Sequence, residues 1–468
     1  MKRLILVSMA VALCATSFAQ KSDIVKTGIN LGPLPAVAFD ADKGFQYGAL
    51  LNIYNYGDGS NYPNYDSKWY FEASFFTKGS QLYTVSYDNK VLIPGVRWSS
   101  TLTAAVDKAF DFYGFNGYMS YFDYDRIAEG KANKTVQDPA KFIFTPFYRA
   151  ARVQVLGKTD FVGDITSALK WEAGYHLSWF KEGEIDRESI NKGKEDYNRF
   201  PDSHSTLFEM YRTLGLIDHE EAGGGLTSSV RLGLTYDTRD KEGAPSRGTW
   251  AEGHITAAPR WLGTKIPHYR YSFTFRQYFP IVKNDVLTLA YRLNYEGTIG
   301  KNAPYYVLPY MTVMGDYYDR DGMGGYRTVR GLMRARVVGL DMATYNLELR
   351  WRFARFQMFN QNIALGLSGF SDGTMVTRGR NLVPSKTMTG SSIRESDGAH
   401  LLSTKIFSGQ EKDSPHITVG AGFRFIMNEN FIVAVEYGTP VSRFVDKSNP
   451  IYGQDGTGAV YINTGYLF

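Results

Sequence analysis

The chain has 468 residues, with 52 Lys and Arg against 47 Asp and Glu, and its formal net charge of +5 is too balanced to indicate a nucleic-acid partner. Tyr, Phe and Trp make up 15% of the chain and Gly is abundant at 47 residues. Beyond the N-terminal segment, no stretch approaches the ~20 consecutive apolar residues of a membrane-spanning helix. This composition is typical of a transmembrane β-barrel, although a large soluble β-protein could share it.

The N-terminus has the features of a secretory signal peptide. Two basic residues precede an apolar run over residues 4–13, and residues 17–19 form a small-residue cleavage site. We expect residues 1–19 to be removed on export, together with Cys14, the only cysteine. The bulky Leu13 before Cys14 argues against a lipoprotein. The exported chain would then contain no disulfide and no thiolate metal site.

Period-two alternation of apolar and polar residues predicts β-strands along the rest of the chain. Over residues 343–353 every second residue is apolar, and the residues between them, such as Glu348 and Arg350, are polar. We expect 16 strands, near 44–56, 67–77, 81–88, 95–106, 113–124, 143–156, 168–180, 226–238, 248–258, 269–281, 285–297, 342–353, 361–370, 416–426, 430–438 and 457–468. In a soluble sandwich the apolar face would form the core, whereas in a membrane barrel it would face lipid.

The lengths of the connections favour the membrane barrel. Long connections follow odd-numbered strands, at 125–142, 181–225, 298–341 and 371–415. Short connections follow even-numbered strands, at 77–80, 282–285 and 427–430. Short periplasmic turns opposite long external loops are expected of outer-membrane barrels in Gram-negative bacteria. We therefore predict an all-β, 16-stranded antiparallel transmembrane β-barrel at 44–468, preceded by a short N-terminal segment at 20–43.

The last predicted strand ends on an aromatic residue. Val460, Ile462 and Thr464 continue to Tyr466 and Phe468 on one face of this strand. A terminal aromatic strand resembles the recognition signal of outer-membrane proteins. We therefore expect Tyr466 and Phe468 to form this signal.

Two segments carry a resemblance to a known family. One is GYRTVRGL at 325–332, which is followed by a strand containing NLELR at 346–350. The other is LTYDTRD at 234–240, which continues through PSRG at 245–248. Together they resemble the BamA/TamA family, also called the bacterial surface-antigen family. Its barrel has 16 strands, with a Val-Arg-Gly-aromatic motif in the loop between the eleventh and twelfth, where our strand count places the first segment.

The resemblance implies an ionic network inside the barrel, formed with the motif Val329, Arg330 and Gly331. Arg330 would bridge Glu348, on the polar face of the twelfth strand, and Asp372, which follows the thirteenth. A long loop folded into the lumen must be held there against its chain entropy, and a guanidinium facing carboxylates can do this. The alternative is that these are ordinary charges on a lumen wall. Where the family has an aromatic residue after the glycine, this chain has leucine.

A second motif lies between the eighth and ninth predicted strands. Pro245 and Gly248 suit a turn, and Asp237 can pair with Arg239. We interpret these four residues as a structural turn motif. We do not expect a binding site there.

No pattern in the sequence indicates catalysis or a bound cofactor. The seven histidines have no metal-ligand spacing, and the SHS triplet at 203–205 does not by itself make a catalytic triad. The acidic residues at 316, 319 and 321 lack the downstream Glu of a calcium loop. We therefore predict no catalytic residue, no metal site and no cofactor, and we keep an outer-membrane lipid hydrolase only for contrast.

The resemblance implies that the protein inserts, assembles or exports outer-membrane components through a lateral seam between its first and last strands. Inserting members of the family carry periplasmic POTRA domains, which we do not expect here because the first predicted strand begins near Gly44. The expected partners are outer-membrane lipids and lipopolysaccharide, unfolded barrel clients, and periplasmic or lipoprotein accessory factors. The alternative is a channel, or a surface-exposed structural barrel without insertase activity.

Overall fold

Sixteen strands form a single antiparallel sheet in which each strand pairs with the next in sequence. The computed structural model describes residues 24–40, 44–122, 145–195, 199–200, 202, 205–312, 322–382, 407–408, 410–429 and 431–468. The strands are β1 (Ile29–Asp40), β2 (Gly44–Asn55), β3 (Ser67–Phe76), β4 (Gln81–Ile93), β5 (Val96–Asp111), β6 (Arg149–Asp164), β7 (Leu169–Gly183), β8 (Gly224–Asp237), β9 (Gly248–Ala258), β10 (His268–Val282), β11 (Leu287–Ile299), β12 (Asp341–Met358), β13 (Gln361–Arg378), β14 (His416–Met427), β15 (Phe431–Pro440) and β16 (Ala459–Thr464). The predicted signal peptide at 1–19 lies outside the described residues.

The helices within the described residues are short and lie in the connections. They are η1 (Gly117–Met119), η3 (Thr145–Tyr148), α3 (Arg187–Asn191), α4 (Leu207–Thr213), η5 (Arg260–Leu262), η6 (Tyr305–Val307) and η8 (Val441–Arg443). In this described part of the chain, no helix is both long enough and apolar enough to cross a membrane.

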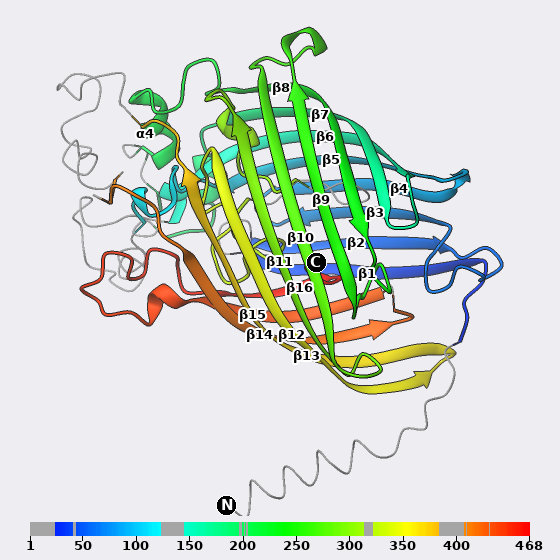
Figure 1. The fold of residues 1–468 in the computed structure, drawn as a ribbon. Helices are drawn as coiled ribbons and strands as arrows, with labels where there is room; N and C mark the ends of the chain where they lie inside the picture. Colours follow the sequence, from blue (N-terminus) through cyan, green and yellow to red (C-terminus); the bar gives the residue numbers. More distant parts are fainter. Residues whose placement is uncertain are drawn as a thin grey trace, which may run out of the picture.

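The sheet curls until its two ends become neighbours (Figure 1). A Cβ placed on Gly32 of β1 would lie 3.3 Å from ring carbons of Phe431 on β15. The side chain of Asn362 on β13 accepts a hydrogen bond from the Ile24 amide at 3.0 Å and donates one to the Ile24 carbonyl oxygen, also at 3.0 Å. The predicted 16-stranded antiparallel barrel is therefore confirmed.

In a soluble β-protein the apolar face of a strand is buried and the polar face is exposed. The strands of this sheet show the reverse. On β12, Leu349 and Trp351 are 42% and 37% exposed, whereas Glu348 and Arg350 are 0% and 3% exposed. Burying apolar surface from water is favourable by about 25 cal/mol per Å², so a band of exposed Leu, Trp, Phe and Tyr is stable only against hydrocarbon. The apolar faces therefore contact lipid and the polar faces line the interior.

Two strand predictions are wrong. One strand was missed and another predicted strand is not observed, so the count of 16 is unchanged. The sheet begins with β1 inside the predicted N-terminal segment 20–43, so the barrel starts at Ile29. Pro33 and Pro35 obscured this strand, but proline is tolerated where a strand lies at a sheet edge. Where a strand was predicted at 113–124, the described residues 113–122 form η1 and irregular chain, because their apolar side chains pack among the loops.

The predicted last strand also ends early. β16 stops at Thr464, and Gly465 has a φ of +89°, a left-handed conformation that glycine adopts readily. The chain then turns into the barrel, where the Tyr466 ring centroid lies 4.1 Å from the guanidinium of Arg350. Phe468 is buried. The two predicted signal residues thus face the interior, because the turn at Gly465 interrupts the alternation of the strand.

The two ends of the barrel differ as the connection lengths predict. Among the described residues, the largest apolar cluster lies at the end that carries α4 (Figure 1), and it is formed by the connections β5–β6, β7–β8 and β11–β12. One assignment changes: the short connection 77–80 follows β3, so it lies at this long-loop end. The other end carries the short turns β4–β5, β6–β7, β10–β11, β12–β13 and β14–β15.

Candidate functional site: an ionic network that holds a loop in the barrel

The described part of the connection between β11 and β12, residues 300–312 and 322–340, folds into the barrel interior, as the resemblance implies. Val329 has no exposed surface and Leu332 is buried beside it. Both belong to an apolar cluster that also contains Met311, Met323, Val337, Met342 and Val376. Leu332, which stands where the family has an aromatic residue, therefore packs with apolar residues of this loop, the start of β12 and the end of β13.

Arg330 lies at the centre of the site, with no exposed surface. Its Nε and Nη2 donate to the two carboxylate oxygens of Asp372 at 2.8 and 3.1 Å, and its main-chain amide donates to the same carboxylate at 3.0 Å. Its Nη1 donates to Glu348 at 3.1 Å and to Glu436 at 2.7 Å. The guanidinium also lies 3.6 Å from the ring centroid of Phe370. The structure thus brings together the three residues that the resemblance implied.

Glu436 was not among the predicted site residues, although it completes the network. Arg424 Nη2 lies 2.6 Å from Glu436 and 2.8 Å from Glu348, and Arg350 Nε donates to Glu348 at 3.3 Å. Three guanidinium groups therefore face three carboxylates. Buried charges are tolerated when they are paired and hydrogen-bonded in this way.

Gly331 lets the loop approach the barrel wall closely. Its φ is +91°, and a Cβ there would lie 2.5 Å from the carbonyl carbon of Gly438 on β15. The Gly331 amide donates to the hydroxyl of Tyr461 on β16 at 3.0 Å. The loop motif therefore contacts the last two strands of the sheet directly.

Gly331→Ala is expected to destabilise the folded barrel by about 1–3 kcal/mol, because alanine is strained in the left-handed conformation and its Cβ would clash with β15. Gly300→Ala is the matched control, since Gly300 has a φ of +81° but a Cβ added to it would meet nothing within 4 Å. Denaturant unfolding in detergent micelles measures both variants. Equal losses of stability would show that only backbone strain matters and that the close approach to β15 does not.

A second set of contacts joins the loop to the C-terminal segment. Arg292 donates to the carbonyl oxygens of Thr328 in the loop and Leu467 in the segment, both at 3.3 Å. Arg350, which also contacts Glu348, donates to the Phe468 carbonyl oxygen at 2.9 Å. The loop network and the inward-turned segment after β16 therefore share the same arginine-lined wall.

The predicted turn motif lies in a connection, 238–247, that crosses the barrel. Arg239 pairs with Asp237 through contacts of 2.9 and 3.1 Å. Gly248 has a φ of +101°, and a Cβ on it would clash with the Thr238 carbonyl oxygen. These contacts account for Asp237, Arg239 and Gly248, which lie near the two ends of the connection. They do not account for the path that the connection takes from β8 to β9.

Residues at the tip of this connection contact opposite walls of the barrel. Glu242 forms ion pairs with Lys90 on β4 and Arg97 on β5. Ala244 packs in a cluster with Ala364 on β13 and with apolar residues of β14 and β15. In a ring of 16 strands, β5 and β13 lie eight strands apart (13 − 5 = 8), on opposite sides. The connection 238–247 therefore forms a floor across the short-turn end, and we call it the floor segment.

The floor segment is also tied to a neighbouring turn. Burial raises the pKa of Asp285 in the β10–β11 turn, but hydrogen bonds from Ser246 and Lys241 outweigh this effect and lower the pKa to about 2. Asp285 is therefore ionised at neutral pH. Lys241 Nζ lies 2.9 Å from its carboxylate.

The barrel has an apolar exterior, and buried ion pairs hold a loop inside it. These two features define the class of protein, an outer-membrane β-barrel with an internally folded loop. The sequence profile of the Omp85 superfamily domain matches residues 155–444, which is more than half of the chain. The chain belongs to the Omp85 superfamily. Barrels of this superfamily are outer-membrane proteins of Gram-negative bacteria that act in insertion or transport.

Two solved structures match this chain over most of its length. BamA from Haemophilus ducreyi lacking POTRA domains 1-3 is 14% identical, with 94% of this chain and 68% of that chain covered at a TM-score of 0.47. CdiB from Escherichia coli is 9% identical, with coverage of 96% and 63% and a TM-score of 0.50. The chain thus spans less than two thirds of CdiB. No curated protein sequence matches the chain.

Proposed function

We propose that the protein inserts, assembles or exports outer-membrane components through a lateral seam between β1 and β16. The shortness of β16 carries this proposal. β16 has six residues and pairs with β15 over 433–438, whereas β1 has 12 residues. At most half of β1 can therefore find a partner on β16. With about 0.5–1.5 kcal/mol for each net hydrogen bond, such a closure is held by only a few kcal/mol.

The inward turn after β16 supports the same proposal. Beyond Thr464 the chain leaves the wall, and Gly32 in the first half of β1 faces the side chain of Phe431 on β15. Separating such a contact breaks no backbone ladder. A client strand could then pair with the free edge of β1, because an unpaired edge is a template for strand addition.

The proposed partners follow from the two surfaces of the barrel. The exposed apolar band would contact outer-membrane lipids and lipopolysaccharide. Unfolded barrel clients would reach the seam from the short-turn end, where residues 24–26 are hydrogen-bonded to the β12–β13 turn region. A periplasmic or lipoprotein accessory factor that binds at this end would deliver the client.

The segments that occupy the barrel interior give less support to the alternative function, a channel or structural barrel. The loop network fills one part of the barrel, and the floor segment crosses its short-turn end. We expect the purified protein to show no steady conductance in planar bilayers. A steady wild-type conductance would favour the channel.

Depletion of the protein tests the proposed function in cells. We expect the amounts of other outer-membrane proteins or exported components to fall several-fold, and to recover when the wild-type chain is supplied again. Periplasmic proteins serve as the control and should stay unchanged. If depletion alters only the uptake of solutes and leaves the composition of the outer membrane unchanged, the assembly or export role is wrong.

A further inference from the structure

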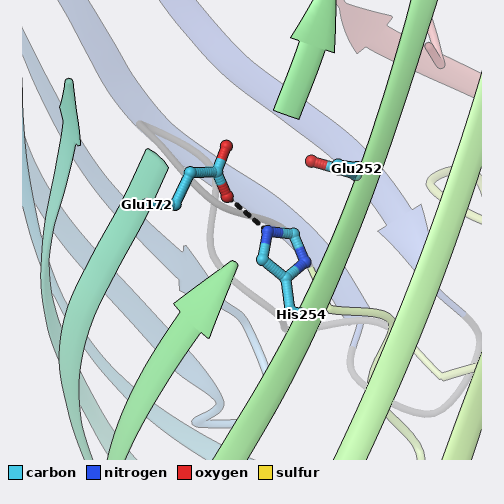
Figure 2. A group of neighbouring side chains, drawn as sticks. All are labelled: Glu172, Glu252 and His254. Atoms are coloured by element: carbon cyan, nitrogen blue, oxygen red, sulfur yellow. Dashed lines mark hydrogen bonds and ion pairs between the residues drawn. The ribbon is translucent and has the colours of Figure 1, made fainter. Parts of the chain in front are cut away.

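A second buried cluster lies in the barrel wall, away from the Arg330 network. It consists of Glu172 on β7 and of Glu252 and His254 on β9 (Figure 2). Each side chain offers one potential ligand atom, and these three atoms all lie within 4.8 Å of one another. The side chains are only 1–2% exposed. Two carboxylates and an imidazole thus converge in a site shielded from bulk water.

The register of the sheet explains how residues from β7 and β9 can meet across β8. Glu172 lies opposite Gly233 of β8, and Gly233 lies opposite His254. A Cβ on Gly233 would clash with the Cδ2 atom of His254. The imidazole therefore crosses β8 through the space left by a glycine, and its Nε2 atom reaches the Glu172 carboxylate.

Each of the three side chains is held by a partner on its other polar atom. Thr235 donates to Glu172 Oε1, and Ser272 lies 3.3 Å from His254 Nδ1. Arg276 lies 3.5 Å from Glu252 Oε1. Glu172 Oε2 and His254 Nε2 thus point at each other, and one carboxylate oxygen of Glu252 lies within 4.8 Å of the ligand atoms of both. Outer partners of this kind orient metal ligands in proteins and fix the histidine tautomer.

One carboxylate oxygen of Glu252 has no partner. Within the described residues, Glu252 Oε2 is buried and forms no hydrogen bond. Burying a carboxylate oxygen without a partner is unfavourable, and Arg276 approaches the other oxygen, Oε1, so a further group is expected beside Oε2. Figure 2 shows the Glu252 carboxylate next to the pair of Glu172 and His254.

We propose that Glu172, Glu252 and His254 bind a divalent transition-metal ion, with zinc the best fit. An imidazole nitrogen and two carboxylate oxygens are ligands that zinc accepts, and water would complete a tetrahedral site. Calcium and magnesium prefer oxygen ligands alone. On binding, the metal replaces the proton shared by His254 Nε2 and Glu172 Oε2, and that proton passes to water. The bound ion would join β7 to β9 and strengthen this part of the wall.

Metal titration of the purified barrel tests the proposal. The full chain, folded in detergent and freed of metal by a chelator, is titrated with Zn²⁺ by calorimetry and with Co²⁺ by visible absorption. We expect one equivalent to bind, with the intense visible bands of tetrahedral Co²⁺. Glu252→Gln keeps the shape of the side chain and should weaken binding by more than about 100-fold, since the loss of an outer partner alone weakens metal sites by about 10–100-fold.

His176→Asn is the matched control. His176 is also a buried histidine on β7 beside a carboxylate, with Nε2 2.7 Å from Asp160, but it is not part of the cluster. This variant should bind Zn²⁺ like the wild type. If Glu252→Gln does not fold, Gly233→Ala provides a second test, because it displaces the His254 ring. The proposal is wrong if the wild type binds no more Zn²⁺ than Glu252→Gln or Gly233→Ala, or if His176→Asn loses as much binding as these two variants.

Discussion

Arg330→Ala is expected to destabilise the folded barrel by about 3–5 kcal/mol, the range for removing one partner of a buried ion pair. The substitution leaves Glu348, Asp372 and Glu436 facing only two guanidinium groups, those of Arg350 and Arg424. Asp372 would lose both side-chain donors and keep only the main-chain amide. Denaturant unfolding in detergent, followed by tryptophan fluorescence, measures the loss.

Two further variants separate the network from general effects on the loop. Arg327→Ala removes a half-buried arginine of the same loop, whose Nε donates to the Tyr326 hydroxyl, and should cost less than about 1 kcal/mol. Arg330→Lys should fall between the two, because an ammonium group cannot make the paired contacts to Asp372. If Arg330→Ala and Arg327→Ala were equally stable, the charges would be ordinary lumen charges and not a network that holds the loop.

Crosslinking β1 to β15 is expected to abolish the proposed function almost completely. Gly32→Cys and Phe431→Cys place thiols on either side of the seam, at a point where a Cβ on Gly32 contacts the Phe431 ring. With Cys14→Ser, no other thiol remains. A short bifunctional thiol reagent would then prevent β1 from separating from the other edge of the sheet. The measurement is the recovery of outer-membrane composition in depleted cells.

The matched control crosslinks two strands that need not separate. Ala49 on β2 lies opposite Ala73 on β3, and cysteines at these positions can be joined by the same reagent. This crosslink should leave recovery unchanged. Full recovery with the Gly32 and Phe431 crosslink in place would rule out a seam that opens at this point, whereas failure of both crosslinked proteins would indicate damage from the reagent.

The strands with strict alternation were predictable because their pattern is local. On β12, the alternation of neighbouring residues separates an apolar face from a polar face, and the connection lengths indicated that the apolar face meets lipid. β1 was missed because its two prolines interrupt the usual signs of a strand, and residues 113–124 were misassigned because apolar loop residues imitate one. Both errors arise where contacts with distant segments, and not local pattern, decide the conformation.

The candidate site was predictable only in part, for the same reason. Arg330, Glu348 and Asp372 could be named because the family resemblance marked the first by its motif and implied the other two as its acidic partners. Glu436 stands on the polar face of β15 like many lumen residues, and nothing in its neighbourhood identifies it as a fourth member. Its place beside Arg330 depends on the pairing of β13, β14 and β15, and on Gly422, where a Cβ would lie 2.8 Å from its Cγ atom.

By itself, the sequence determined which side of most strands meets lipid and which loop carries the central arginine. The tertiary structure alone decided that the floor segment spans opposite walls, that the chain turns inward at Gly465, and that Glu172, Glu252 and His254 converge. Alternation is set by the two-residue repeat of a strand and can be read from neighbours in the chain. Convergence across β8 depends on the register of three strands and on one missing side chain, and that register exists only once the sheet has formed.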